Sequence, residues 1–361
     1  MFTKQDIELI NENFQRNKRI IHNRNNIDKI CVECGCQINE STYKVEDEVI
    51  TESKTDCNGV IIHRGEKFVC IAVGLSKPSQ NGKTGPMIQV YMIHSEIDPV
   101  TAQKTGDDAT VCLQCIHRGK SCYVNPGQGV DQVFKSFKNG NYPELPTKNG
   151  IPVNESLWRR IFQGSSIRFG AYGEPVLIPL PTIELLTNIV EGRITGYTHA
   201  WRSHPDYKKF FMASVDTPQE YFKAKSMGWR TFRVSSSWHQ KDADETFCKY
   251  NLDGTECIDC LKCRGNLEQD KNIFVKVHGP AFKTKRFIEL MGKNDFQFPP
   301  MSDEERRIAD ELERKDLEAK KRKRKMEIPV DPLEQLAQSR DMQRKHTKIE
   351  PPKPTDYLEK M

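Results

Sequence analysis

Apolar and polar residues follow two different patterns along the chain. Between residues 59 and 97, short β-like runs predominate, among them GVIIHRGEKFVCIAVGL and PMIQVYMIHSEI. From Ile167 onward, short apolar runs alternate with stretches of helical periodicity: IRFGAY precedes LPTIELLTNIVEG, FFMASVD precedes TPQEYFKAKSMG, and NIFVKV precedes AFKTKRFIELMG. Strands separated by helices in this way favour βαβ units and a parallel sheet.

Two local signals sharpen these boundaries. The run GVDQVFKSFKNG places four apolar residues at helical spacing and reaches Gly140, which predicts a helix that stops there. Asp216, Thr217 and Pro218 follow an apolar strand, and a capping residue ahead of a first-turn proline is typical of a strand-to-helix corner.

The fold class expected from these patterns is α/β, with an open or partial (β/α) barrel, Cys-rich metal-binding insertions and a charged C-terminal tail. We expect a cysteine-containing N-terminal region at 1–84, an α/β core at 85–300, and a charged helix with a disordered end at 301–361. Within that tail, the run KKRKRK at 320–325 fits either a phosphate-binding patch or a solvated helix face.

Composition narrows the class of protein. The formal net charge is +5, hydrophobic residues make up 36%, and no apolar run reaches the ~18 residues of a spanning helix, so we expect no membrane partner. The N-terminus lacks the apolar core of a signal peptide, which predicts a cytoplasmic protein. In that compartment the twelve cysteines are expected to be reduced thiols, and clustered reduced thiols favour metal binding.

The first cysteine group has three members with a histidine inside it. Cys112, Cys115 and Cys122 form C-x2-C-x6-C around His117. Three thiolates on a four-iron cluster leave one iron free for an external ligand, which is the arrangement that chemistry at the metal requires. Alternatively, His117 supplies a fourth ligand and closes a Cys3His zinc site.

The second group carries four thiolates, enough for a complete shell around zinc or a four-iron cluster. Its members are Cys248, Cys257, Cys260 and Cys263. Their close spacing favours iron–sulfur over a zinc ribbon. A third small site could be built from Cys31, Cys34 and Cys36 with Cys57 or Cys70, although the last two equally fit buried apolar positions.

The order of these parts resembles the radical S-adenosylmethionine enzymes over roughly residues 85–292. A strand, IQVYMIHS, precedes the three-cysteine loop, the next strand ends in GAYGEP, and a later strand reads FFMASVD. The resemblance implies a [4Fe–4S] cluster on the first cysteine group and an auxiliary cluster on the second. It implies S-adenosylmethionine contacts from two places, the turn Gly173, Glu174 and Pro175 and the Ser-x-Asp pair Ser214 and Asp216.

The implied activity is reductive cleavage of S-adenosylmethionine to a 5′-deoxyadenosyl radical, with electrons from a flavodoxin-like donor. The cysteine spacing differs from the family's usual C-x3-C-x2-C, and Tyr172 stands where the turn's first glycine would be. The chain also resembles an uncharacterised Cys-rich family of tailed bacteriophages. That likeness implies a host-cytoplasmic enzyme acting on a nucleotide or a DNA base, for example in an isomerase-type rearrangement during thymidine hypermodification.

Two other functions fit the same residues. One is a non-enzymatic zinc protein that binds nucleic acid, and the other is a barrel-type base-exchange enzyme (transglycosylase) with structural zinc. His199, at the end of a predicted strand, fits a proton donor or a structural histidine. The tryptophans fit core positions or base-stacking surfaces; they are Trp201, Trp229 and Trp238. The run NGKTGP is no phosphate loop, because Lys77 occupies the required glycine position.

Overall fold

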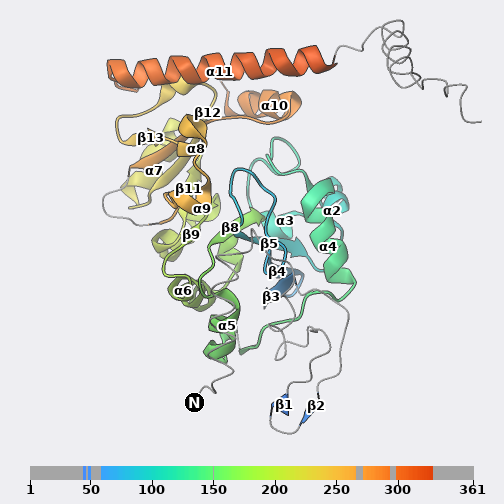
Figure 1. Cartoon of the computed structure of the whole chain (residues 1–361). Coiled ribbons are helices and arrows are strands. Elements are labelled where there is room, and N and C mark those ends of the chain that lie inside the picture. Colours follow the sequence, from blue (N-terminus) through green and yellow to red (C-terminus); the bar gives the residue numbers. More distant parts are fainter. Residues whose placement is uncertain are drawn as a thin grey trace, which may run out of the picture. The chain divides into compact units, whose positions relative to one another are not determined.

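The computed structural model describes residues 58–148, 150–265, 271–292 and 298–327, together with two short strands near residue 46. The chain divides into two units, Met1–Arg306 and Arg307–Met361. All strands and the candidate site belong to the first unit, which is described by itself (Figure 1). Cys31, Cys34, Cys36 and Cys57, which the sequence suggests for a third metal site, lie outside the described residues.

The first five-stranded sheet has the order β3-β4-β5-β8-β9. Antiparallel pairing joins the first three strands, and parallel pairing joins β5 to β8 and β8 to β9. The strands are β3 (Gly59–Arg64), β4 (Phe68–Val73), β5 (Ile88–His94), β8 (Ile167–Tyr172) and β9 (Ile194–Thr195). Cys70 lies on β4 with no exposed surface, which agrees with its interpretation as a buried apolar residue.

The second five-stranded sheet has the order β10-β11-β12-β14-β13, and every pair in it is parallel. Its strands are β10 (Tyr197–Thr198), β11 (Met212–Val215), β12 (Thr231–Ser235), β13 (Glu245–Phe247) and β14 (Asn272–Lys276). Two small antiparallel ribbons complete the strands: β1 (Lys44–Val45) with β2 (Glu48–Val49), and β6 (Thr147–Lys148) with β7 (Ile151–Pro152).

A single residue, Gly196, separates β9 from β10, so one stretch of chain passes directly from the first sheet to the second. Its amide donates a hydrogen bond to the carbonyl of Cys263 at 2.8 Å. A Cβ atom here would lie 2.8 Å from the Phe211 ring, which is closer than a side chain tolerates. Within each sheet, parallel pairing brings the carboxyl ends of the paired strands to one edge.

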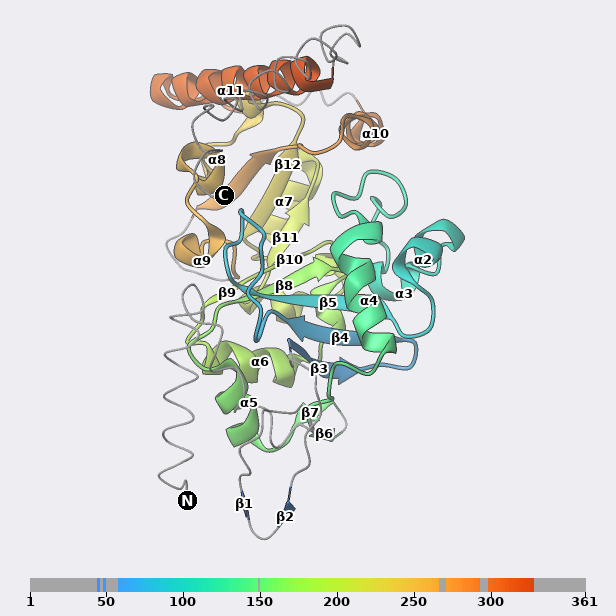
Figure 2. The same ribbon diagram turned by 45° about the vertical axis from the view of Figure 1, so that its right-hand side comes forward.

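The helices fall between the strands, as the alternating pattern predicts. Figures 1 and 2 both show α2 with α4 at one side of the first sheet and α5 with α6 at the other. The α-helices of the first unit are α2 (Pro99–Thr105), α3 (Ala109–Cys112), α4 (Asp131–Lys138), α5 (Glu155–Phe162), α6 (Leu180–Ile189), α7 (Pro218–Ser226), α8 (Lys249–Asp253), α9 (Cys257–Cys260) and α10 (Ala281–Met291).

The two local sequence signals are confirmed. Helix α4 ends at Lys138, two residues before Gly140, whose φ of +73° suits glycine. Helix α7 begins at Pro218, and the Thr217 hydroxyl accepts a hydrogen bond from the amide of Glu220 at 3.2 Å. The cap of this helix is therefore Thr217, which leaves the Asp216 side chain available to the pocket described below.

The core of the first sheet is one large apolar cluster. It combines residues of the strands with the inner faces of α4, α5 and α6, including Trp158 and Phe162. The three tryptophans of the second sheet region are 0–3% exposed, and none lines the site described below: Trp201, Trp229 and Trp238. They are core residues, and the base-stacking interpretation is wrong for them in this structure.

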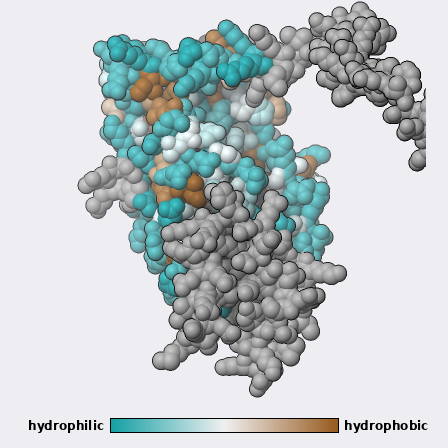
Figure 3. All heavy atoms as spheres, viewed as in Figure 1, coloured by the Kyte–Doolittle hydropathy of each residue, from teal (hydrophilic) through white to brown (hydrophobic). Residues whose placement is uncertain are grey.

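The predicted α/β class with parallel strands is confirmed. Helix α11 (Asp303–Glu327) occupies the predicted charged segment and carries intrahelical ion pairs such as Arg314 to Glu318 at 2.5 Å. The expected disordered end beyond it lies outside the described residues. Within the described residues, no helix combines the length and apolar character needed to cross a bilayer. Figure 3 shows a mainly hydrophilic described surface with small apolar patches.

Candidate cysteine-lined pocket

A cavity of about 230 Å³ opens at the carboxyl ends of the parallel strands. Residues from the loop after α3 line it, together with residues that follow β8, β10 and β11. The ends of β12 and β14 contribute Val234 and Val277. Both sheets therefore build the pocket, at the edge where parallel α/β proteins carry their functional side chains.

The three cysteines of the first group all line this pocket: Cys112, Cys115 and Cys122. The loop turns sharply after α3, where Leu113 has a φ of +49° and the Cys115 amide donates to the Cys112 carbonyl at 3.1 Å. Burial raises the pKa of the Cys112 and Cys122 thiols, and the neighbouring cysteines of the group raise both further. Metal binding by Cys112 and Cys122 would therefore release their protons.

The second cysteine group reaches the same pocket through Cys248 and Cys263. Burial raises the pKa of Cys263, and the charges of Cys248, Cys257 and Cys260 add to that effect. The run NGKTGP, which is not a phosphate loop, contacts the second cysteine group. The backbone amides of Cys257 and Ile258 donate hydrogen bonds to the carbonyls of Lys83 and Thr84 in that run.

Neither cysteine group forms a compact set of ligand atoms among the described residues. Among the described residues, the His, Cys, Asp and Glu groups whose ligand atoms lie within 4.8 Å of one another are Cys115–Glu174–His199 and His117–His199–Asp216. Within this part of the chain, no three cysteine sulfurs meet that limit. A zinc ion with four 2.3 Å bonds to sulfur needs sulfurs about 3.8 Å apart, so neither group is drawn together around a single ion.

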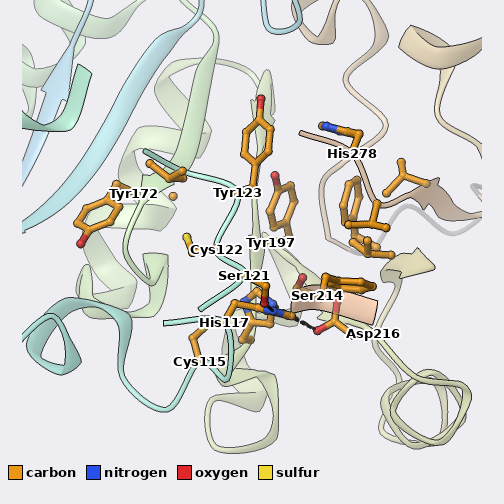
Figure 4. A pocket seen from close by; sticks show the side chains of 18 of the residues that line it. Cys115, His117, Ser121, Cys122, Tyr123, Tyr172, Tyr197, Ser214, Asp216 and His278 are labelled. Carbon is orange, nitrogen blue, oxygen red and sulfur yellow. Dashed lines mark hydrogen bonds and ion pairs between the residues drawn. The ribbon is translucent and has the colours of Figure 1, made fainter. Parts of the chain in front are cut away.

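His117 is not directed at the cysteines beside it. Its Nδ1 lies 2.6 Å from the Ser121 hydroxyl, and its Nε2 lies 2.7 Å from a carboxylate oxygen of Asp216 (Figure 4). The ring stacks on Phe287 with centroids 5.4 Å apart. This arrangement does not support His117 as the fourth ligand of a closed Cys3His zinc site.

The predicted Gly-Glu-Pro turn lies at the end of β8. Gly173 and Glu174 line the pocket, whereas Pro175 begins the short 3-10 helix η4 (Pro175–Leu177) and does not line it. The Glu174 amide donates to the Val111 carbonyl at 2.8 Å, which ties the turn to the helix that leads into the cysteine loop. The Glu174 carboxylate is 6% exposed and accepts from the Thr198 hydroxyl at 2.5 Å, so it is held inside the protein.

Ser214 and Asp216, at the end of β11, both line the pocket. The Asp216 side chain is 2% exposed, and its carboxylate faces His117. The sequence resemblance predicts both residues as cofactor contacts. The structure brings both to the cavity, and there the Asp216 carboxylate faces His117.

His199 lies between the turn and Asp216. Its Nδ1 is 3.4 Å from the Glu174 carboxylate, and its Nε2 is 3.8 Å from the Asp216 carboxylate. Burial by itself lowers the pKa of His199, but hydrogen bonds with Cys115 and Glu174 outweigh burial and raise it well above the usual value. His199 is therefore part of the site rather than a structural histidine elsewhere in the fold.

Several lining residues were not found from the sequence. Arg168 lies on β8, and Lys83 lies in the loop before β5; both cations lower the pKa of Cys257 against the effect of burial. Tyr197 and Phe232 stack with centroids 4.5 Å apart and form an aromatic wall. A charged residue inside the apolar run IRFGAY was the one signal that could have indicated Arg168.

Comparison of the chain with protein-family models, with curated proteins and with solved structures finds no match. The interpretation of this pocket consequently depends on its own geometry and chemistry.

Proposed function

We propose that the protein is an iron–sulfur enzyme of the radical S-adenosylmethionine type. The observation that carries the proposal is that seven cysteines in two groups, 136 positions apart at their first members, supply five side chains to one pocket at the carboxyl ends of parallel strands. Chance cysteine spacing does not predict such convergence, whereas a catalytic cluster beside an auxiliary one requires it.

The first group fits a cluster with one open position. Cys112, Cys115 and Cys122 all line the pocket and would hold three irons of a [4Fe–4S] cluster. Both ring nitrogens of His117 already have other partners, so His117 is not placed to bind the fourth iron. This supports an open position on that iron. The four cysteines of the second group would hold a fully ligated auxiliary cluster.

The polar end of S-adenosylmethionine has a suitable place at the turn after β8. Gly173 brings the backbone to the cavity with a φ of +81°, and Glu174 fixes the turn through Thr198 and the backbone amide of His199 at 3.1 Å. The bound cluster and cofactor supply reductive cleavage of a carbon–sulfur bond to a carbon radical. The chain's own residues bind the methionine end, orient the adenosine and exclude water.

The strand order supports a partial (β/α) barrel as the finer fold. Gly196 connects β9 of the first sheet directly to β10 of the second, and residues at the strand ends of both sheets line one pocket. Catalytic groups in such folds come from strand ends, as Glu174, His199 and Asp216 do here.

A nucleotide or a DNA base is the proposed substrate class. The stacked pair of Tyr197 and Phe232 offers an aromatic face, and Lys83, Arg168 and Lys283 supply cations around the same cavity. Aromatic stacking and cations together are the usual means of binding a base and its phosphates. A flavodoxin-like reductant remains the proposed electron donor, and the cytoplasm the proposed location.

The zinc alternatives predict a different metal. A zinc protein that binds nucleic acid, or a base-exchange enzyme with structural zinc, needs sulfurs close enough to share one ion, and no three cysteine sulfurs of the described residues lie within 4.8 Å of one another.

The test begins with anaerobic purification of the full chain. We expect brown protein with broad visible absorption, about eight irons with matching sulfide per chain, and release of 5′-deoxyadenosine from S-adenosylmethionine under dithionite. Cys115→Ala removes cleavage and leaves about four irons in the second group. Cys260→Ala removes the second group's iron. Colourless protein with stoichiometric zinc, or cleavage retained in Cys115→Ala, contradicts the proposal.

The matched control is Cys70→Ala. Cys70 is fully buried on β4 and does not line the pocket. This variant removes a thiol without removing a proposed ligand, so it keeps both iron content and cleavage. If Cys70→Ala also loses iron, the iron loss in the other variants is explained by misfolding and not by removal of a ligand.

A further inference from the structure

A second group of ligating side chains lies in the pocket beside the first cysteine group. His117, His199 and Asp216 place one ligand atom each within 4.8 Å of one another. They come from three separate places in the chain: the cysteine loop, the end of β10 and the end of β11. Two imidazoles and one carboxylate are a set that binds divalent transition metals and leaves coordination positions open.

The two imidazoles present the same nitrogen to the carboxylate. The Nε2 atoms of His117 and His199 lie 2.7 and 3.8 Å from the same Asp216 oxygen, and their ring centroids are 5.3 Å apart at 63°. Cis ligands with bonds of about 2.1 Å to a metal lie about 3 Å apart, so small side-chain movements suffice to receive an ion here.

The opposite nitrogen of each imidazole already has a partner. Nδ1 of His117 is 2.6 Å from the Ser121 hydroxyl, and Nδ1 of His199 faces the buried Glu174 carboxylate at 3.4 Å. Metal-binding histidines commonly use the second nitrogen in this way, because a hydrogen bond there fixes the ring and the tautomer. A hydroxyl suits His117, since it accepts a hydrogen bond from Nδ1–H as readily as it donates one to a bare Nδ1.

We propose that His117, His199 and Asp216 bind one divalent transition-metal ion, with Ser121 and Glu174 as positioning residues. The proposed ligands are nitrogen and oxygen atoms, whereas Cys115, whose sulfur also lies within 4.8 Å of a His199 ring nitrogen, is assigned to the cluster. Three protein ligands leave open positions toward the cavity, where His199 is 26% exposed in its side chain. An oxygen or nitrogen of the substrate is the chemical class that fits those positions.

The test uses the full-length protein, which is first reconstituted with iron and sulfide and then treated with a chelator. This protein is titrated with Mn²⁺. Free Mn²⁺ is followed by electron paramagnetic resonance, and this ion prefers oxygen and nitrogen over thiolate. We expect one equivalent to bind to the unmodified chain, and binding to be lost in His199→Gln and in Asp216→Asn. Ser121→Ala weakens binding by about 10- to 100-fold.

Two controls separate the outcomes. His204→Asn changes a histidine outside the cavity, where Nδ1 lies 3.2 Å from the Ala200 carbonyl, and it leaves Mn²⁺ binding intact. Cys122→Ala loses the first cluster and still binds Mn²⁺. If the unmodified chain binds no Mn²⁺, or if both His199→Gln and Asp216→Asn bind it normally with unchanged circular dichroism, the metal site is overturned. If the unmodified chain takes up no iron and sulfide on reconstitution but still binds Mn²⁺, the proposed function is overturned and the metal site stands.

Discussion

At the scale of single residues, Gly173 shows how tightly the pocket wall is built. With a φ of +81°, it places the turn against β5, and an added Cβ atom would lie 2.7 Å from the Met92 Cβ and 3.1 Å from the Val111 carbonyl. Neither the left-handed backbone nor the space admits a side chain. The position of Glu174, and with it that of His199, depends on this residue.

We therefore expect Gly173→Ala to lower the free energy of unfolding by about 1–3 kcal/mol and to weaken S-adenosylmethionine binding. Urea denaturation and ligand titration measure the two effects. Gly140→Ala is the matched control: its φ is also positive, at +73°, but nothing lies within 4 Å of the added atom, and it is far from the pocket lining. Equal effects of the two substitutions on ligand binding would contradict the role given to the turn.

At the scale of elements, a buried ion pair holds the edge strand of the second sheet. Arg233 on β12 donates two hydrogen bonds to Glu245 on β13, at 2.7 and 2.6 Å, across the intervening β14. Both side chains are at most 2% exposed, and the guanidinium lies 4.6 Å from the Phe274 ring centroid. Removal of one partner would leave a charge without compensation in an apolar environment.

We expect Arg233→Met to cost about 3–5 kcal/mol of unfolding free energy, and the double variant Arg233→Met/Glu245→Leu to recover much of that loss. Denaturant titration followed by circular dichroism measures both. The exposed pair of Arg202 and Glu220, at 2.6 Å, is the control, and Arg202→Met should cost no more than about 1 kcal/mol. Similar costs at the two sites would show that burial is not what makes the first pair important.

At the scale of the first unit as a whole, the pocket joins the two sheets. Its lining comes from β8 in one sheet and from β11, β12 and β14 in the other. A ligand bound there contacts both sheets only in the folded state, so its binding free energy adds to the free energy of unfolding of the whole unit.

S-adenosylmethionine at about 100 times its dissociation constant should stabilise the reconstituted protein by about 2.7 kcal/mol, seen as a rise in Tm of several degrees. Scanning calorimetry under anaerobic conditions measures the shift. Adenosine, which lacks the methionine end, should give a smaller rise, and Cys115→Ala should respond to neither. An unchanged Tm with S-adenosylmethionine would contradict cofactor binding in this pocket.

The sequence by itself determined the local features of this protein. Hydrophobic periodicity and capping residues predicted the parallel strands, helix α4 and the corner at Thr217, because these depend on residues a few positions apart. Cysteine spacing likewise identified the two groups, and the order of elements located the turn at Gly173. The short strand β13 escaped notice, because three residues with a central threonine carry no periodic signal.

Only the tertiary structure decided how these parts meet. His117 and Asp216 are 99 positions apart and hydrogen-bond at 2.7 Å, and no local pattern specifies such a pair. The same holds for the two cysteine groups, which share a pocket because parallel strands bring their carboxyl ends together whatever their separation in sequence. His117 faces away from the cysteines, and the tryptophans lie in the core. Both outcomes depend on side-chain direction and burial, which long-range packing sets and which one sequence does not reveal.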